Sequence, residues 1–392
     1  MGAWFVIPAL VVLLSAMRRT RGEIFMDIDQ KLQEVCRHFC INGTYLGYTL
    51  IQVGNVNKTY RVRIQQPDGS EKFFLIQNVN TYVFKNPIQV MENIDKVTEH
   101  IRAKLPGQVA LHFHHTEDRK TYVLDGTNFW RMTNYIPSTT YNAVKDMNVV
   151  RNAGRAFGQF QMQLRDFDIA ELHETIPNFH NTQKRYDSLR ASVAADPCGK
   201  VSEVREELDY LFSVEELACQ LTHMADAGEL PLRVTHNDTK INNVLFDQEG
   251  DNALVVIDLD TVMPGLVGHD FGDAIRFAAN KVEEDDPCFE KAGINMDVFR
   301  AFTEGFLEHT ASILTQNEID TLALSSFALT VELAVRFLDD YIQGSPYFKI
   351  NYPEHNLVRT RCQIALAKDM QKNMQKMEQC VRECVDALKC RA

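Results

Sequence analysis

The stretch 234–272 constrains the fold most strongly, because it contains two short apolar runs with polar residues at one end of each. The first run, 244–246, directly follows the octapeptide HNDTKINN at 236–243. The second run, 254–257, ends at Asp258, and the turn sequence QEGDNA lies between the runs. Short apolar runs separated by such a turn predict a β-hairpin. This hairpin would bring Asp258 beside the end of the octapeptide.

The octapeptide has the spacing H-x-D-x-x-x-x-N, which is typical of a phosphoryl-transfer loop. Such chemistry needs an acceptor for a hydroxyl proton, a cation near the moving phosphate and oxygen ligands for Mg²⁺. We predict Asp238 as the base and Lys240 as the phosphate contact. Asn243 and Asp258 are the predicted Mg²⁺ ligands. The alternative is an ordinary hairpin with solvated polar turns, and the compound pattern makes it the weaker interpretation.

A second candidate for the metal carboxylate is Asp270, which begins the tripeptide Asp-Phe-Gly. The hairpin that must supply this carboxylate already ends at Asp258, and Asp270 follows much later along the chain. We therefore expect Asp270 and Asp273 to cap a helix over 274–280, since Asp is favoured at a helix start.

The net charge and the cysteine pattern indicate which binding partners and which cellular compartment to expect. The formal net charge is −12 and no cluster of Lys and Arg stands out, so nucleic acid and anionic membranes are not expected as partners. An anionic nucleotide such as ATP must then be held by local donors and Mg²⁺. The nine cysteines show no C-x-x-C or zinc spacing, which favours free thiols in a reducing cytoplasm.

The N-terminus begins with an apolar run, 3–17, that three arginines follow at once. The run is too short to span a bilayer comfortably, and a signal peptide carries its positive charges before the apolar part. Of three glycosylation sequons, the one at Asn237 lies inside the octapeptide, where a glycan would block the site. We expect 1–25 to be an extension outside the fold of a cytoplasmic protein, with a short membrane anchor as the alternative.

The region 26–135 has the pattern of a small antiparallel sheet with helices. Strands are expected at 48–53, 60–64 and 73–77, with a further hairpin of 109–113 and 121–124. A helix begins after Asn86 with Pro87 in its first turn. The turn between the first two strands is the candidate phosphate-covering loop, and its predicted nucleotide-binding residues are Gly54, Asn57 and Thr59.

The region 136–392 is expected to be a helical lobe that carries the hairpin. Asp146 is placed to cap a helix whose apolar positions continue to Leu164 at helical spacing. The segment 129–136 would cross between the lobes. Further helices are expected at about 201–226, 297–313, 317–342 and 357–388.

A small sheet, a hinge and a helical lobe with a catalytic hairpin form an α+β, bilobal arrangement. It resembles the protein-kinase-like fold of the aminoglycoside phosphotransferase and choline kinase superfamily, and within it the N-acetylhexosamine 1-kinases. The resemblance rests on strings in the same order along the chain, namely NxxVFKNPxxVMENI (80–94), AGRAFGQFQMQL (153–164), THNDTKINNVLFD (235–247), IDLDTVMPG (257–265), DFGDAIRFAAN (270–280) and VELAVRFLDDYIQGSPYFKI (331–350).

This resemblance implies ATP- and Mg²⁺-dependent phosphorylation of the anomeric hydroxyl of N-acetylglucosamine or N-acetylgalactosamine. It gives Asp238, Lys240, Asn243 and Asp258 the roles predicted above. It also implies that Phe277, Arg336 and Tyr347 line the sugar. Asn55 stands near the sugar where the family more usually has His, which leaves the preferred hexosamine open. Asn78 stands where the family has Arg.

Three alternatives remain open from the residues alone. Arg336 could be a helix-surface arginine paired with Glu332 or Asp340 at i, i+4, and Tyr347 a packing residue at a helix end. The acceptor could be choline, an aminoglycoside or another small hydroxyl compound. A nucleotide-binding scaffold without catalysis is the third alternative, and the intact Asp238, Asn243 and Asp258 speak against it.

Overall fold

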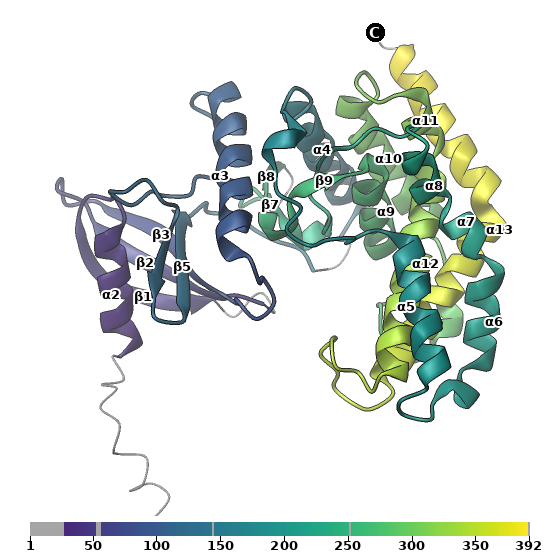
Figure 1. Ribbon diagram of the computed structural model, residues 1–392. Helices are drawn as coiled ribbons and strands as arrows, with labels where there is room; N and C mark the ends of the chain where they lie inside the picture. The colour runs from purple at the N-terminus through teal and green to yellow at the C-terminus, as the bar shows by residue number, and fades with distance from the viewer. Residues whose placement is uncertain (1–26, 52–55, 143–144, 251, 391–392) are drawn as a thin grey trace, which may run out of the picture. The chain divides into compact units, whose positions relative to one another are not determined.

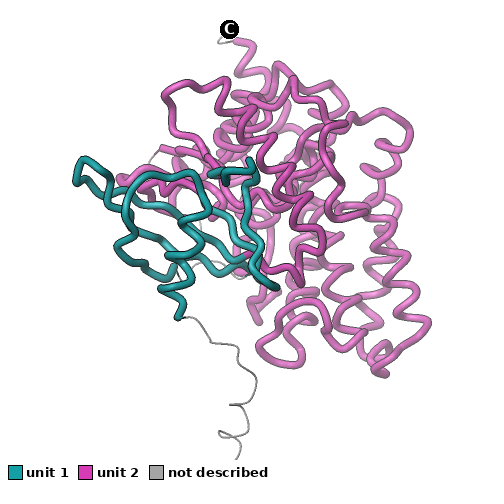
Figure 2. Tube along the Cα trace, turned by 60° about the vertical axis from the view of Figure 1, so that its left-hand side comes forward, with its two compact units in different colours: residues 1–78, 114–132 teal, residues 79–113, 133–392 magenta. Residues whose placement is uncertain are grey.

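The structure is a computed structural model that describes residues 27–51, 56–142, 145–250 and 252–390. The chain folds into two compact units (Figure 2). The first contains the residues up to Asn78 together with 114–132, and the second contains 79–113 and 133 onward. Each unit is described by itself.

The first unit is built on a five-stranded sheet, which confirms the small-sheet half of the predicted α+β, kinase-like fold. The strand order is β1-β2-β3-β5-β4, and β1/β2, β2/β3 and β4/β5 are antiparallel pairs (Figure 1). The strands are β1 (Thr44–Ile51), β2 (Lys58–Gln65), β3 (Glu71–Val79), β4 (Tyr122–Asp125) and β5 (Asn128–Asn134).

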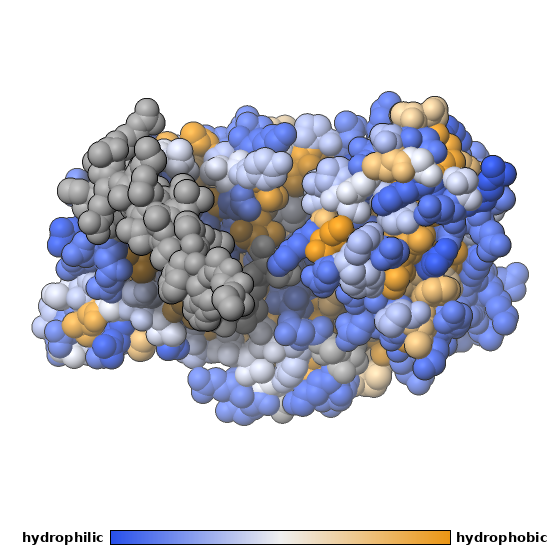
Figure 3. Space-filling model, turned by 90° about the horizontal axis from the view of Figure 1, so that it is seen from below, coloured by the Kyte–Doolittle hydropathy of each residue, from blue (hydrophilic) through white to orange (hydrophobic). Residues whose placement is uncertain are grey.

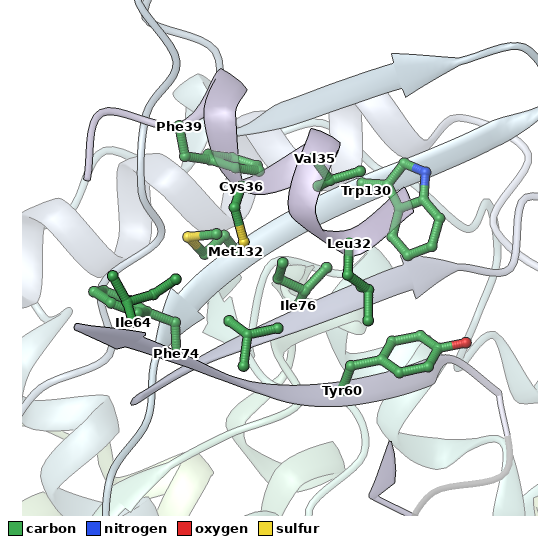
Figure 4. Close-up of a cluster of buried hydrophobic side chains, with 11 residues drawn as sticks. Leu32, Val35, Cys36, Phe39, Tyr60, Ile64, Phe74, Ile76, Trp130 and Met132 are labelled. Carbon is green, nitrogen blue, oxygen red and sulfur yellow. The ribbon is translucent and has the colours of Figure 1, made fainter. Parts of the chain in front are cut away.

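One helix, α2 (Ile28–His38), packs on this sheet and supplies Leu32, Val35 and Cys36 to its core. Alternate residues of β2 point toward the helix, as the two-residue period of a strand requires, so Val62 is buried between outward-facing arginines. Figure 4 shows the resulting cluster. Its members are Leu32, Val35, Cys36, Phe39, Tyr60, Val62, Ile64, Phe74, Ile76, Trp130 and Met132.

The predicted hairpin of 109–113 with 121–124 is wrong in its first strand, and 129–136 is not simply a crossing segment. The strand Tyr122–Asp125 pairs instead with Asn128–Asn134 through a tight turn. Gly126 and Thr127 form that turn, and Gly126 has the positive φ of 58° that such hairpins need. Phe113 forms only an isolated bridge to Thr133.

The second unit is mostly helical, which confirms the helical half of the predicted fold. It also holds two small sheets, β6/β9 and β7/β8. Its helices are α3 (Pro87–Lys104), α4 (Met147–Gln163), α5 (Thr182–Ala195), α6 (Arg205–Ser213), α7 (Glu215–Ala218), α8 (Gln220–Asp226), α9 (Val267–Ala278), α10 (Met296–Thr310), α11 (Gln316–Asp320), α12 (Leu322–Ile342) and α13 (His355–Lys389). Its strands are β6 (Arg233–Thr235), β7 (Val244–Phe246), β8 (Ala253–Val256) and β9 (Met263–Gly265).

The predicted helix starts and breaks are partly correct. Asp146 caps α4, since its carboxylate accepts the backbone N–H groups of Asn148 and Val149. The single helix expected at 201–226 is divided into a 3-10 turn (Val201–Glu203), α6, α7 and α8. Helix α5 is not among the predicted elements.

Helices α4 and α10 pack with their backbones in direct contact. A Cβ atom at Gly154 or Gly158 of α4 would overlap the backbone of α10 at Phe302 or Phe306. A Cβ atom at Gly305 would overlap the carbonyl oxygen of Arg151. Only glycine allows this approach without a shift of one helix.

Apolar side chains on the surface are scattered. The face in Figure 3 is mainly hydrophilic, with separate apolar patches. No helix within the described residues is long and apolar enough to cross a membrane. The extension predicted for 1–25 lies outside the described residues.

Candidate active site

The hairpin predicted within the stretch 234–272 is present in the structure. Strands β7 and β8 pair antiparallel, and the Ile257 N–H donates to the Asn243 carbonyl at 2.8 Å. Asp258 follows immediately, is exposed, and has a left-handed backbone with φ of 62°. A non-glycine residue in this conformation costs about 1 kcal/mol or more, and such strain clusters at functional sites.

Three predicted site residues of the loop before β7 lie together. Asn243 Nδ2 donates to the Asp238 carbonyl at 2.8 Å and to Asp238 Oδ2 at 3.2 Å. Lys240 Nζ lies 2.7 Å from Asp238 Oδ1, and both side chains are half-buried. The loop therefore holds a carboxylate with an amide on one oxygen and an ammonium on the other.

His236 holds the loop 236–243 in place through hydrogen bonds of both ring nitrogens. Its Nε2 lies 2.8 Å from the Ile257 carbonyl, and its Nδ1 accepts the Asp238 N–H at 3.3 Å. This assigns the neutral tautomer with the proton on Nε2. The imidazole is fully buried, so it orients the loop rather than meeting a ligand.

Asp270 does not cap the start of a helix at residue 274, so that prediction is wrong. Helix α9 begins at Val267, and Asp270 is buried within its first turns. Its carboxylate accepts the N–H of His236 at 3.0 Å, the N–H of Asn237 at 2.8 Å and Gln161 Nε2 at 2.9 Å. Burial raises the pKa of Asp270, and these donors offset part of that rise. This carboxylate is occupied by the loop 236–243, so of the two candidates Asp258 stays the predicted metal ligand.

Asp273 also lies inside α9 and forms an ion pair. Arg276 Nε and Nη2 donate to its Oδ1 at 3.0 and 2.9 Å, and Arg276 Nη1 donates to Glu284 at 2.5 Å.

Lys240 lies near two carboxylates that keep it charged. Burial alone would lower the pKa of Lys240, but the carboxylates of Asp238 and Asp273 outweigh this effect and raise that pKa. The ammonium of Lys240 is therefore fixed as a cation.

Arg336 of α12 lies between aromatic rings and forms no ion pair with a described carboxylate. Its guanidinium lies 5.6 Å from the centre of the Phe179 ring and 5.5 Å from that of Phe348. The alternative pairing with Glu332 or Asp340 is wrong, because both carboxylates have other partners. Asp340 accepts the N–H groups of Tyr347 at 2.8 Å and Phe348 at 3.0 Å.

Glu332 is the buried carboxylate beside Arg336. His180 Nδ1 lies 3.0 Å from its Oε1, and Thr182 Oγ1 donates to its Oε2 at 2.9 Å. Burial alone would raise the pKa of Glu332, but His180 and the nearby Arg336 and Arg185 lower it to about 2. Glu332 is therefore a permanent anion with both oxygens occupied.

Two other predicted acceptor residues lie at the surface of the second unit. Tyr347 is 70% exposed, and its ring meets the Phe348 ring edge-on at 4.9 Å. It is therefore not the packing residue of the alternative interpretation. Phe277 lies near the end of α9 and is half-buried.

The predicted phosphate-covering residues belong to the first unit. Gly54 and Asn55 lie outside the described residues. Asn57 is half-buried just before β2, and Thr59 is buried within β2, where its hydroxyl accepts Gln77 Nε2 at 3.0 Å.

The donor set fits Mg²⁺ at Asn243 and Asp258. The amide nitrogen of Asn243 is used by Asp238, so its Oδ1 is the atom that can serve as a ligand, and the carboxylate of Asp258 would supply the second oxygen. No group of three or more His, Cys, Asp or Glu side chains among the described residues could hold a metal ion. Two oxygen ligands completed by substrate phosphates are the usual arrangement for Mg²⁺.

His180, and the partners of Glu332 and Asp270, were not predicted. Each of these contacts joins segments that are far apart along the chain, so no local spacing indicates them. Only the presence of a buried carboxylate could be anticipated, since Glu332 is flanked along the chain by Val331 and by the apolar residues 333–335.

Comparison with solved structures places the fold among kinases of small molecules. An aminoglycoside phosphotransferase from Alicyclobacillus acidocaldarius matches with 13% identity and a TM-score of 0.58, over 93% of this chain and 98% of that chain. A microcompartment-associated aminopropanol kinase matches with 14% identity and a TM-score of 0.59, over 89% and 98%. A choline kinase from Cryptosporidium parvum matches with 13% identity and a TM-score of 0.53, over 88% and 96%. These likenesses show a shared fold.

Sequence comparison identifies the family itself. Residues 49–302 match the phosphotransferase enzyme family, and this range includes the catalytic loop, the hairpin and helix α9. Because the match covers well over half of the chain, the protein belongs to the phosphotransferase enzyme family.

Proposed function

We propose that this protein transfers the terminal phosphoryl group of ATP, with Mg²⁺, to the anomeric hydroxyl of an N-acetylhexosamine. The observation that carries the proposal is the geometry of Asp238, which has Asn243 at one oxygen and Lys240 at the other. The family match supports phosphoryl transfer, and the resemblance of the six strings given above to N-acetylhexosamine 1-kinases supports the acceptor.

In this proposal Asp238 accepts the proton of the attacking hydroxyl. General-base assistance of this kind contributes roughly 100- to 10,000-fold to a rate. Lys240 contacts the phosphates, and its raised pKa keeps it charged while it does so. Asn243 and Asp258 would hold Mg²⁺, which neutralises charge on the transferred phosphoryl group when bound. Gly54, Asn57 and Thr59 would cover the nucleotide.

Two arginines lie in the proposed acceptor region, which favours a neutral sugar over a cation. Besides Arg336, Arg185 lies near Glu332, and its Nε is buried with no acceptor among the described residues. Burial and the charge of Arg336 lower the pKa of Arg185. Glu332 is already occupied, and Asp339, a second described carboxylate near Arg185, accepts hydrogen bonds at both oxygens, so neither is free to bind the ammonium of choline or an aminoglycoside.

The same residues suit the groups of an N-acetylhexosamine. Arg336 offers fixed N–H donors to hydroxyl, ring and acetamide oxygens. Tyr347 offers an exposed ring face against which a pyranose can lie. Phe277 and Asn55 complete the proposed sugar contacts.

The proposal includes an organisation of the chain. Residues 26–135 would form the nucleotide-covering lobe, 136–392 the helical lobe with the sugar site, and 1–25 an extension outside the fold. A cytoplasmic location is supported by the cysteines, all nine of which are free thiols.

A sugar panel tests this function. The protein is incubated with ATP, Mg²⁺ and N-acetylglucosamine, N-acetylgalactosamine, glucosamine, choline or an aminoglycoside, and the product is identified by phosphorus NMR. We expect phosphate on the anomeric oxygen of the N-acetylated sugars alone. Phosphate on another hydroxyl, or on choline, would disprove the acceptor, and a lack of Mg²⁺-dependent turnover with any acceptor would favour a non-catalytic scaffold.

A further inference from the structure

His180 joins the catalytic loop to helix α12 through a buried ion pair. Its Nδ1 lies 3.0 Å from Glu332 Oε1, and its Nε2 lies 3.3 Å from the backbone carbonyl of Asn237. Both contacts are to oxygen acceptors, which is the geometry of an imidazole that donates from both ring nitrogens. The exposed fractions of the two side chains are 7% for His180 and 2% for Glu332.

The carbonyl that His180 contacts belongs to the peptide group between Asn237 and Asp238. The N–H of the same peptide group donates to His236 Nδ1 at 3.3 Å. Two histidines thus hold the two polar atoms of one peptide plane, and the Cα of the proposed base is attached to that plane. Asn237 itself has a left-handed φ of 63°, which requires support from its surroundings.

Glu332, the other member of the ion pair, lies on helix α12, which also carries the proposed acceptor residue Arg336. Glu332 lies one helical turn before Arg336 on α12, so the two side chains project from the same face. Thr182 at the start of α5 donates to the second oxygen of Glu332 at 2.9 Å, which stops the carboxylate from rotating away.

Stability alone is a poor reason for such a pair. Removing two charges from water costs several kcal/mol, and apolar residues of similar volume often stabilise a core as well or better. His269 lies with its ring centre 4.9 Å from that of His180, and burial and the charge of His180 lower the pKa of His269 to about 3, so His269 is neutral and adds no positive charge beside Glu332.

We propose that His180 and Glu332 are positioning residues that fix the Asn237–Asp238 peptide relative to helix α12. The pair would set the direction of the Asp238 carboxylate toward a hydroxyl held near Arg336. This inference rests on the proposed role of Asp238, but it does not depend on which hydroxyl compound is the acceptor. Misplacing a catalytic group by about 1 Å costs on the order of 100-fold in rate.

The test compares His180→Gln, Glu332→Gln and the double variant with wild type. We expect each single variant to lower kcat roughly 10- to 100-fold with little change in the KM for ATP. Because the two residues would act as a unit, the double variant should be little worse than either single one. Slow ATP hydrolysis without a sugar is measured as well, since water then replaces the acceptor.

Glu207→Gln is the matched control, because Glu207 is also a buried carboxylate in an ion pair, with Arg361 Nε at 2.6 Å, between α6 and α13. The Glu207→Gln variant should have a lower melting temperature than wild type but the same kcat. Nitrogen-15 spectra of the histidines give a readout that does not depend on turnover. They should show both nitrogens of His180 protonated in wild type, and a changed Nδ1 signal in Glu332→Gln.

The outcomes separate the two proposals. If wild type does not phosphorylate an N-acetylhexosamine, the proposed function fails, and the effect of the pair is still read from ATP hydrolysis and from the spectra. If the His180 and Glu332 variants lose melting temperature as Glu207→Gln does but keep wild-type kcat and hydrolysis, the pair is only structural and the positioning proposal is overturned. A neutral His180 in wild type would also overturn it.

Discussion

The ammonium of Lys240 lies 2.7 Å from Asp238 Oδ1, on the opposite side of the carboxylate from the Asn243 amide. Asp238→Asn should therefore keep the shape of the loop while removing the proton acceptor. We expect turnover to fall about 100-fold or more with an unchanged melting temperature. Asp247→Asn, in the turn of the same hairpin, is the control for the substitution itself. Turnover within a few-fold of wild type in Asp238→Asn would place the base elsewhere.

Asp258 and Asp270 should respond differently to substitution. Asp258→Ala is expected to abolish Mg²⁺-dependent ATP binding, measured by titration calorimetry, with little loss of stability because the side chain is exposed.

Asp270→Asn should do the reverse. It weakens the carboxylate that accepts two backbone N–H groups and Gln161, so we expect a loss of about 3 kcal/mol in the free energy of unfolding. The protein that remains folded should still bind ATP with Mg²⁺. The opposite ranking would make Asp270 the metal ligand.

Arg336→Ala tests the acceptor site. The arginine is held between Phe179 and Phe348 without an ion pair among described residues, so its donors are available to a sugar. We expect the KM for N-acetylhexosamine to rise steeply, by about 100-fold, while the KM for ATP stays the same. Arg382→Ala, at an exposed position of α13, should change neither constant. Equal losses for both substrates would remove Arg336 from the sugar site.

Acid should destabilise the second unit in two steps. Burial lowers the pKa of His269 to about 3 in the fold, so between the ordinary value of 6.5 and 3 the unfolded chain binds a proton that the folded chain does not. Glu332, with a pKa of about 2 against 4.5, adds the same effect at lower pH. Stability is therefore present above pH 6.5 and decreases as the pH falls.

Urea unfolding at a series of pH values measures this effect. In His269→Gln the dependence between pH 6.5 and 4.5 should flatten, whereas the exposed His223→Gln should leave it as in wild type. An unchanged slope in His269→Gln would show that another group carries the acid sensitivity.

The catalytic hairpin was predictable because its information is local. Two apolar runs, a turn and polar residues at fixed spacing lie within one stretch, and the strands Val244–Phe246 and Ala253–Val256 form where expected. The start of α4 at Asp146 was predictable for the same reason, since a cap depends on neighbouring residues.

The wrong or missing predictions have two causes: two segments competed for the same strand partner, or the contacts join residues far apart along the chain. The segment 109–113 looks like a strand, but the Gly126-Thr127 turn pairs 122–125 with the following residues instead. Asp270 looks like a helix cap, yet the backbone N–H groups that it accepts are those of His236 and Asn237, which come from another element. His180 has no local signal at all, because both of its partners lie in distant segments.

The glycine contacts between α4 and α10 have a consequence for how this chain can change over time. Gly154, Gly158 and Gly305 each touch the backbone of the opposite helix, so a larger residue at one of them requires a compensating shift of the other helix. Helix α4 also carries Gln161, which donates to the Val234 carbonyl at 3.0 Å and to Asp270 at 2.9 Å, on either side of the catalytic loop. A shift of α4 would therefore move the loop that carries Asp238. A substitution at any of these three glycines therefore requires a compensating change in the opposite helix. Substitutions on the solvent-facing side of either helix carry no such requirement.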